Sequence, residues 1–379
     1  MAVSIKEVLD KKYLKTFVTL PFTLYKDDPM WVPQLIRDDM EIFDREKNPA
    51  FDYSDSRLFL AYQDGRPVGR IAAIHNRAAN EKYGTKNLRF GWFDSINNPE
   101  VAAALFQAVE GWARELGLET LSGPHGFCDL DPQGMLVEGF DQLPTIAGYY
   151  NFPYYQKLVE GLGYVKEIDY VEFRAQVPKE MSAFPEKLLR LADRILERGN
   201  LRLIKFEKKK DILGRAVELF HLLDEAFDEI YGSVPLTERQ IQYYIKKYFS
   251  FVDKDLIQAV VNEKDEMIGF MIAMPSLSLA FQKANGRLFP LGWWHLLRAF
   301  KNNDVLDFYL AGIKKSYRGM GVDLLMVVNI ARAAVAKGFR FTESNQELET
   351  NNKIQAQWKY FNPVQHKRKR IFKKFLKSV

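Results

Sequence analysis

Cysteine is nearly absent from this sequence of 379 residues, in which Cys128 is the single one. One cysteine can form neither an internal disulfide nor a cysteine-based metal site, so the chain is not a disulfide-stapled secreted domain and fits a reducing cytoplasm. Long apolar runs are also missing: no stretch reaches about 18 uncharged apolar residues, and the first residues lack an apolar signal core. We therefore expect a cytoplasmic protein.

A large excess of one charge is missing too. The sequence has 54 Lys and Arg against 49 Asp and Glu, a net charge of +5. That surplus is too small at this length to require a nucleic-acid partner. Apolar residues make up 47% of the chain and aromatic residues 14%, which excludes a disordered chain and allows either a large aromatic core or an apolar cleft.

The sequence contains two similar halves. Two predicted strands between residues 58 and 74, joined by a polar turn, match a second predicted hairpin between residues 256 and 274, with Gly69 and Gly269 at equivalent positions. We place the boundary between them at residues 180–200, which gives domains of residues 1–180 and 200–379.

The next elements of the two halves also match. A helix predicted from about residue 99 to 116 ends before Gly117, and one predicted from about residue 322 to 337 ends before Gly338. Each helix stands between two predicted strands, and the second half carries an insertion between Pro275 and Asp304. Such alternation of strands and helices indicates an α/β or α+β layered sheet in each half.

The segment 310–325 joins a predicted strand to an apolar helix through a loop with three glycines and the cations Lys314, Lys315 and Arg318. The first amides of a helix have no partner within it, and glycines let an anion approach the backbone closely. This pattern predicts a site for a phosphate or diphosphate. An ordinary turn with solvated lysines is the alternative.

This order of elements resembles the acyl-CoA N-acyltransferase superfamily known as GNAT, whose members bind acyl-CoA with a loop of pattern (Gln/Arg)-x-x-Gly-x-(Gly/Ala). Arg318 matches the first position and Gly321 the fourth, while Asp323 stands at the sixth. The resemblance implies two tandem GNAT-like domains, each with a mixed, mostly antiparallel central sheet flanked by helices. It implies contacts to acetyl-CoA or another acyl-CoA from Ala311, Gly312, Ile313, Arg318, Gly319, Met320, Gly321, Val322, Asp323 and Asn352.

The whole chain resembles the bacterial YghO-like group of tandem GNAT-like proteins. The segments that carry this resemblance are residues 123–127, 138–141, 150–155 and 285–290. In the first half, the equivalent loop 94–100 has no Arg-x-x-Gly-x-Gly pattern and no basic residue, so we expect that half to be degenerate for CoA binding and to serve as scaffold or as a wall of the acceptor cleft.

In this superfamily an amine attacks the thioester directly, and the strands before and after the cofactor loop part to admit the pantetheine arm. The resemblance implies a bulge near Ala311 or Gly312 that offers an amide to the oxyanion, Glu343 as the base, and Tyr360 as proton donor to the thiolate, with no metal. A solvated strand end for Glu343 and helix-end packing for Tyr360 are the alternatives.

Three further segments are distinctive. The aromatic insertion 288–301 is a lid over a long acyl or lipid-like substrate, an interfacial helix at a membrane, or a helix packed between the domains. The basic end 366–377 is a solvated face, an edge strand protected by lysines, or a surface for nucleic acid or anionic lipid. The tyrosine-rich segment 149–155 lines an acceptor cleft or packs a helix start.

His125 with Asp129 and Asp131 has the side chains of a metal or acid–base cluster, but no second histidine stands nearby. The main hypothesis is therefore an acyl-CoA-dependent N-acyltransferase, for acetyl or longer acyl groups, that acts on a small-molecule or lipid-like amine. A catalytically inactive GNAT-fold scaffold and an N-acyltransferase at a membrane surface are the alternatives. The acceptor, the acyl chain length and the oligomeric state stay open.

Overall fold

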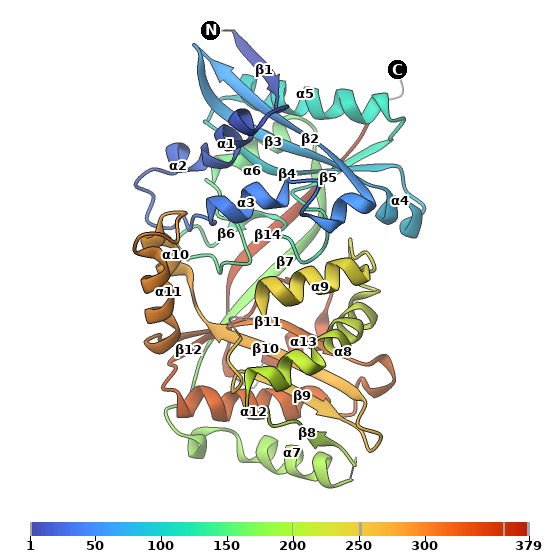
Figure 1. The fold of residues 1–379 in the computed structure, drawn as a ribbon, viewed down its shortest axis with the longest axis vertical. Helices are drawn as coiled ribbons and strands as arrows, with labels where there is room; N and C mark the ends of the chain where they lie inside the picture. The colour runs from blue at the N-terminus through green and yellow to red at the C-terminus, as the bar shows by residue number, and fades with distance from the viewer. Residues whose placement is uncertain (1, 199, 250–251, 359–360, 377–379) are drawn as a thin grey trace.

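The computed structural model describes residues 2–198, 200–249, 252–358 and 361–376. Their strands join into one 14-stranded sheet whose main path runs β1-β2-β3-β4-β5-β14-β7-β12-β11-β10-β9-β8, with β6 paired to β14 and β13 paired to β7. Helices cover the sheet in an upper and a lower half (Figure 1). The fold is α/β, with a large mixed sheet flanked by helices, as predicted.

The first half contains seven strands and six α-helices among its described residues. The strands are β1 (Val3–Glu7), β2 (Ser54–Gln63), β3 (Arg66–Asn76), β4 (Asn87–Ser95), β5 (Thr120–Gly123), β6 (Met135–Glu138) and β7 (Val165–Gln176). The helices are α1 (Lys11–Thr19), α2 (Pro21–Leu24), α3 (Ile36–Ile42), α4 (Arg77–Tyr83), α5 (Pro99–Glu115) and α6 (Tyr154–Gly161), with a short 3₁₀ turn η1 (Pro49–Asp52).

The second half repeats this order within its described residues. Its strands are β8 (Arg202–Leu203), β9 (Ile257–Val261), β10 (Met267–Pro275), β11 (Val305–Ile313), β12 (Phe341–Glu343), β13 (Glu347–Leu348) and β14 (Val364–Phe375). Its helices are α7 (Glu186–Arg198), α8 (Lys209–Phe227), α9 (Glu238–Tyr248), α10 (Ser278–Ala284), α11 (Gly292–Lys301), α12 (Val322–Ala336) and α13 (Asn352–Trp358), with 3₁₀ turns η2 (Met181–Ala183) and η3 (Lys315–Tyr317).

The repeated helices begin and end where local chemistry requires. Asn98 caps α5 by accepting from the Glu100 amide, and Pro99 occupies a first-turn position where no amide donor is needed. Gly117 and Gly338 adopt positive φ of 67° and 76° just after α5 and α12, which favours glycine at a helix end.

The two halves exchange their last strands. β7 comes from the first half but pairs with β12 of the second, and β14 comes from the second half but pairs with β5 of the first. β7 and β14 also pair with each other in antiparallel fashion, and they run side by side through the middle of the molecule (Figure 1). The two sequence halves are thus built into one continuous sheet.

The place of β14 corrects the prediction for the basic end of the chain. Lys367 and Lys369 are buried rather than solvated, and β14 is a central strand rather than an edge. Arg368 and Arg370 pair with the buried Asp169 of β7. The positive charges of β14 are thus largely neutralised within the protein, and this segment is not a free basic surface for nucleic acid or lipid.

The insertion in the second half forms α10 and α11, which pack against the first half. The Ile36 amide donates to the Gly286 carbonyl over 3.0 Å, and Gln282 donates to the carbonyls of Pro29 and Trp31. Phe300 on α11 packs against an apolar cluster shared by both halves. No helix among the described residues has both the length and the apolar character that a membrane span needs.

Candidate functional site

The predicted anion loop lies at the surface before α12. Gly319 and Gly321 both have positive φ, of 80° and 83°, and a side chain at Gly321 would collide with Ile195 of α7. Gly321 therefore meets two conditions that only glycine satisfies, a left-handed backbone and close contact with a neighbouring helix. The sequence could show the glycines but not that α7 requires one of them.

The loop presents open amides. The amides without an acceptor among the described residues are those of Gly319, Gly321, Val322, Asp323 and Leu324. Asp323 does not turn into the loop, because its Oδ2 accepts a hydrogen bond of 2.5 Å from Gln357 Nε2 on α13. The aspartate thus leaves the helix N-terminus free for an anion.

Two of the cations of this loop, Lys315 and Arg318, are already paired with acids just after α8, and Lys314 pairs with Glu266 of the β9–β10 turn. Arg318 Nη1 lies 3.1 Å from Glu229 Oε2, and its Nη2 donates to the Ala226 carbonyl. Lys315 Nζ lies 3.2 Å from Asp228 Oδ2. These pairs are exposed, so a diphosphate can compete for the cations at little cost.

The strands on either side of the loop part, as the resemblance implies. β11 and β12 pair in parallel only from Val305–Phe341 to Asp307–Glu343. Beyond that point the Ser344 amide donates instead to the Phe173 carbonyl of β7, over 2.8 Å. The ends of β11 and β12 are therefore not paired with each other on the side where the loop and α12 begin, and we call this separation the wedge.

The strand has a bulge, but it lies two residues before Ala311. The register of β10 and β11 shifts between Ile272 and Ala273, which leaves Tyr309 as the extra residue. Ala311 and Gly312 pair regularly, and the lack of a side chain at Gly312 serves another purpose: a Cβ there would lie 2.6 Å from the Phe270 ring. Close packing of the strand on Phe270, not backbone irregularity, accounts for this glycine.

Glu343 lies in a buried cluster of charges, not at a solvated strand end. Its side chain is 10% exposed, with Arg174 Nη1 at 3.5 Å and Lys367 Nζ at 3.3 Å. Lys367 Nζ also lies 2.9 Å from Glu172 Oε2, and Lys369 Nζ lies 3.3 Å from Glu172 Oε1. The cluster joins β7, β12 and β14, so the strand exchange is what assembles it.

Burial and neighbouring charge set the titration of this cluster. Burial alone would raise the pKa of Glu172, but Lys367 and Lys369 lower it to about 2. Burial and the nearby Glu343 raise the pKa of Asp307 to about 7. Burial and the nearby Lys367 lower the pKa of His366 to about 3, so its ring is neutral. A carboxyl group with a pKa near 7 is suited to proton transfer.

Asp307 and His366 are candidate functional residues that the sequence reasoning missed. Asp307 Oδ1 and both ring nitrogens of His366 are buried and have no hydrogen-bond partner among the described residues. His366 Nε2 lies 3.8 Å from Glu343 Oε2. One signal was available, since Asp307 is an acid within an otherwise apolar predicted strand. The position of His366 depends on the strand exchange, which the sequence does not reveal.

Of the two predicted site residues on the last helix, the structure places one. Asn352 begins α13, and Gln357 of that helix reaches Asp323, so α13 lies beside the start of α12. Tyr360 lies outside the described residues.

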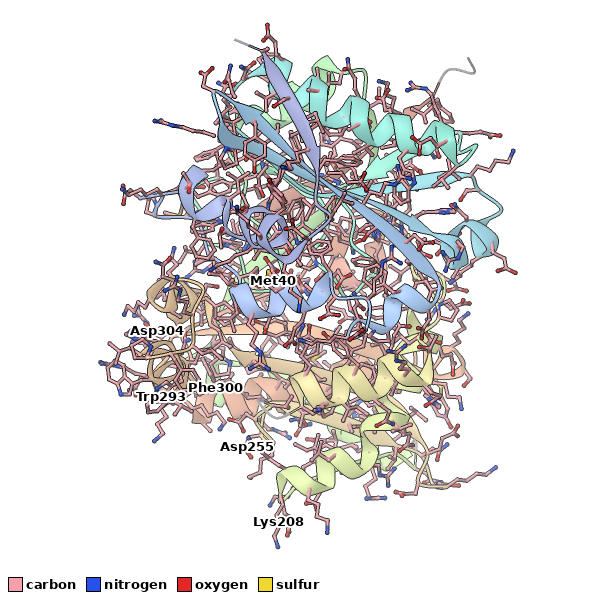
Figure 2. All side chains as sticks on the ribbon, turned by 45° about the horizontal axis from the view of Figure 1, so that its top comes forward. Met40, Lys208, Asp255, Trp293, Phe300 and Asp304 are labelled. Atoms are coloured by element: carbon pink, nitrogen blue, oxygen red, sulfur yellow. The ribbon has the colours of Figure 1, made fainter. Side chains whose placement is uncertain are left out.

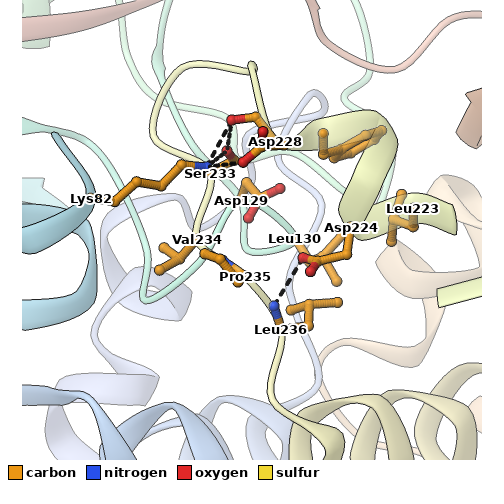
Figure 3. Close-up of a pocket in the computed structure, with 11 residues that line it drawn as sticks. Lys82, Asp129, Leu130, Leu223, Asp224, Asp228, Ser233, Val234, Pro235 and Leu236 are labelled. Atoms are coloured by element: carbon orange, nitrogen blue, oxygen red, sulfur yellow. Dashed lines mark hydrogen bonds and ion pairs between the residues drawn. The ribbon is translucent and has the colours of Figure 1, made fainter. Parts of the chain in front are cut away.

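A small pocket lies between the two halves beside the same loop, lined by Lys82, Asp129, Asp224 and Asp228 among others (Figure 3). Lys82 Nζ lies 3.1 Å from Asp228 Oδ1. Burial raises the pKa of Asp129 to about 6. Acids outnumber bases here, and Lys82 compensates one of them.

The residues around His125 do not form a cluster with it. Asp131 Oδ2 accepts from the amides of Phe127 and Cys128 and thereby fixes a turn. The His125 ring is buried, and burial lowers its pKa well below the ordinary value. Within the described part of the chain, no three His, Cys, Asp or Glu side chains gather as a metal site would require.

No family model matches the chain. Two relatives match nearly all of it. Protein YghO of Escherichia coli K12 is 29% identical over 376 residues, which cover 98% of this chain and 95% of YghO. A protein named bacterial ceramide synthase, from Caulobacter vibrioides, is 28% identical over 375 residues, which cover 96% of this chain and 95% of that protein.

Solved structures share the fold. A tandem GNAT protein from the clavulanic acid biosynthesis pathway matches with a TM-score of 0.58 at 11% identity, over 100% of both chains. A probable N-acyltransferase from Enterococcus faecalis V583 matches with a TM-score of 0.51 at 7% identity, over 99% of this chain and 73% of that chain. The chain thus has the fold of tandem GNAT proteins and is similar to YghO over almost its whole length.

Proposed function

We propose that this protein is an acyl-CoA-dependent N-acyltransferase for an amine with a long apolar chain. The observation that carries the proposal is the set of open amides at the start of α12, which Asp323 leaves free. Between this anion site and the buried cluster at Glu343, the ends of β11 and β12 are no longer paired with each other. The free, buried thiol of Cys128 fits a reaction in the cytoplasm.

The relative named bacterial ceramide synthase supports the lipid-like acceptor. A ceramide is a long-chain amino alcohol whose nitrogen carries an acyl group, so its synthesis is an N-acylation. An acetyl group and a small soluble amine are the other outcomes of the substrate test below.

In the proposed reaction the amine nitrogen attacks the thioester carbonyl carbon. The C–N bond forms, the C–S bond breaks, and the nitrogen loses a proton. Glu343 accepts that proton, with Asp307 beside it as a second acceptor, and Tyr360 supplies a proton to the departing sulfur. The developing oxyanion lies near the bulge at Tyr309, where a main-chain amide can stabilise it.

The test combines CoA binding by calorimetry with thiol release from acetyl-CoA and palmitoyl-CoA in the presence of short and long amines. Arg318→Glu should weaken CoA binding at least tenfold. Arg332→Glu, an equal charge change further along α12, should leave it unchanged. Glu343→Gln and Asp307→Asn should lower kcat at least tenfold without changing CoA affinity. Wild-type protein that does not bind CoA would contradict the proposal, and binding without thiol release would favour the inactive scaffold.

We further propose that α11 rests on an anionic membrane surface. Phe289, Leu291 and Leu297 are 78%, 63% and 54% exposed, and Trp293 lies at the edge of the molecule (Figure 2). The exposed cations that border this apolar face are Lys283, Arg287, Arg298 and Lys301. An apolar face bordered by cations is typical of an interfacial helix.

Vesicle sedimentation tests this surface. Wild-type protein should sediment with vesicles that contain phosphatidylglycerol, and less so at high salt. The double variant Trp293→Ser with Leu297→Ser should reduce binding at least tenfold. Leu213→Ser, at an exposed leucine of α8, is the matched control. Equal sedimentation of wild type and the double variant would exclude α11 as the contact.

A further inference from the structure

The first half contains a partly open cavity of the kind that binds ligands, concave and lined mainly by apolar and aromatic side chains with a few polar groups. It lies against β4, which has parted from β5 after Arg89, so it occupies the place that the wedge occupies in the second half. Its walls are rich in aromatic side chains: Phe22, Tyr25, Trp31, Trp92, Phe93 and Tyr149. Part of the tyrosine-rich segment 149–155 therefore lines a cavity.

One carboxylate in this cavity has no partner. The Asp39 side chain lines the cavity and is 7% exposed, and it makes no hydrogen bond or ion pair with any described residue. Burial raises the pKa of Asp39 to about 7, although the charge of Arg70 acts in the opposite direction. A buried carboxylate in this state is strongly stabilised by a cation that hydrogen-bonds to it.

Arg70, the buried cation of the cavity, is already engaged. Its Nε lies 2.7 Å from Asp94 Oδ2, and its Nη1 donates to the Phe17 carbonyl over 2.8 Å. Asp94 also accepts from the Tyr25 hydroxyl over 2.6 Å. Arg70 and Asp94 therefore neutralise each other, and the charge left for a ligand is the negative one on Asp39.

A second polar group in the cavity lacks a partner. The Trp92 indole Nε1 is buried and has no acceptor among the described residues, although Trp92 lines the cavity. A buried N–H without an acceptor costs free energy that a ligand oxygen can recover. Trp92 also has a left-handed backbone, with φ of 46°, at a register shift between β3 and β4. A bulky residue in that conformation is typical of functional sites.

We propose that this cavity binds a primary amine with a neighbouring hydroxyl or carbonyl oxygen and an apolar chain, the ammonium on Asp39 and the oxygen on the Trp92 indole N–H. The aromatic walls hold the head of the ligand, with the ammonium in cation–π contact, and the chain leaves through the open side of the cavity. Binding of this ligand does not depend on the proposed function. Only the role of the ligand as the acyl acceptor does.

The surroundings of the cavity fit this ligand class. Phe22 of the cavity wall packs against Gly286, in the insertion that carries α11, so the outer wall of the cavity contacts that insertion. On the inner side, Gly134 lines the cavity and packs against Lys369 of the charged cluster. The cavity thus lies between the proposed membrane contact and the proposed reaction centre.

Calorimetry on the full chain, without acyl-CoA or vesicles, tests the proposal with dodecylamine, 2-aminododecan-1-ol and dodecan-1-ol below their aggregation concentrations. Wild-type protein should bind both amines at least tenfold more tightly than the alcohol. Asp39→Asn should remove that preference. Trp92→Phe should weaken binding of the amino alcohol about fivefold and leave dodecylamine unchanged. Asp38→Asn, one residue away and outside the cavity lining, is the control.

Equal affinity of the wild type for dodecylamine and dodecan-1-ol would overturn the proposal, and so would a folded Asp39→Asn variant that keeps the preference. If Asp39→Asn does not fold, the amine-to-alcohol affinity ratio of the wild type and of Trp92→Phe tests the proposal instead. Thiol release is measured separately, so amine binding without acyl transfer would contradict the proposed function and leave this site in place.

Discussion

At the scale of single residues, the most unusual feature is a pair of lysines buried in the middle of a sheet. Lys367 and Lys369 are each 1% exposed and share the carboxylate of Glu172, which is buried to the same degree. Removing one partner of a buried ion pair costs about 3–5 kcal/mol, because the other charge is left uncompensated. Glu172 therefore holds the centre of the protein together.

We predict that Glu172→Gln lowers the free energy of unfolding at pH 7 by roughly 3 kcal/mol or more. The pKa of Glu172 is lowered from 4.5 to about 2 in the folded protein, so its contribution is fully present above pH 4.5 and is lost as the pH falls through 2. Urea unfolding at several pH values should show the two proteins converging below pH 4.5.

The matched control is Glu119→Gln. Glu119 pairs with Lys86 at the surface, where the two side chains are 67% and 64% exposed, and such pairs contribute about 0–1 kcal/mol. A loss for Glu172→Gln no larger than for this control would mean that the buried cluster does not stabilise the fold.

The buried lysines also show where sequence reasoning ends. The run from His366 to Lys377 has many charges and no apolar alternation, a pattern typical of a solvated segment. Its main acidic partners lie on β7, about two hundred residues earlier. Nothing local in the sequence indicates that pairing, whereas the place of Glu343 at the end of β12 follows from its own strand; its role as the base stays a prediction.

At the scale of elements, the repeated glycines of the two hairpins have the same structural role. A Cβ on Gly69 would lie 2.9 Å from Leu105 of α5, and one on Gly269 would lie 2.6 Å from Val322 of α12. Each glycine lets a helix approach the sheet closely. Hairpins, helices and their ends were predictable because turn and cap residues are local signals. The bulge at Tyr309 was not, because it depends on how β11 pairs with β10.

We predict that Gly269→Ala destabilises the protein by about 1–3 kcal/mol, because the added methyl group overpacks the contact with Val322. Since Val322 begins α12, the change should also weaken CoA binding. Thermal unfolding and calorimetry with CoA measure the two effects.

Gly214→Ala is the control for this substitution. Gly214 lies within α8 and has open space around its Cβ position, so alanine there should stabilise the helix by roughly 0.5–1 kcal/mol. Full stability and CoA affinity in Gly269→Ala would show that α12 has room to move away from the sheet.

At the scale of the whole molecule, the exchange of β7 and β14 makes each half depend on the other. Residues 1–180 contain β7 without β12 and β5 without β14, so both strands lose a neighbour. Exposed, unpaired strand edges promote aggregation.

We predict that residues 1–180 and 200–379, produced separately, are aggregated or unfolded, and that producing them together yields a soluble 1:1 complex. Size-exclusion chromatography and circular dichroism test this. A soluble, cooperatively folded fragment 1–180 would show that β14 is dispensable to the first half. The full chain should unfold in one transition, since the sheet is continuous.

The strand exchange also determines when the first half can finish folding during translation. The strand that completes the sheet beside β5 is encoded more than two hundred codons downstream of it, so a nascent chain leaves the ribosome with its first half still unfinished. Translation must pass residue 375 before that half can close, and until then a chaperone has an open strand to shield.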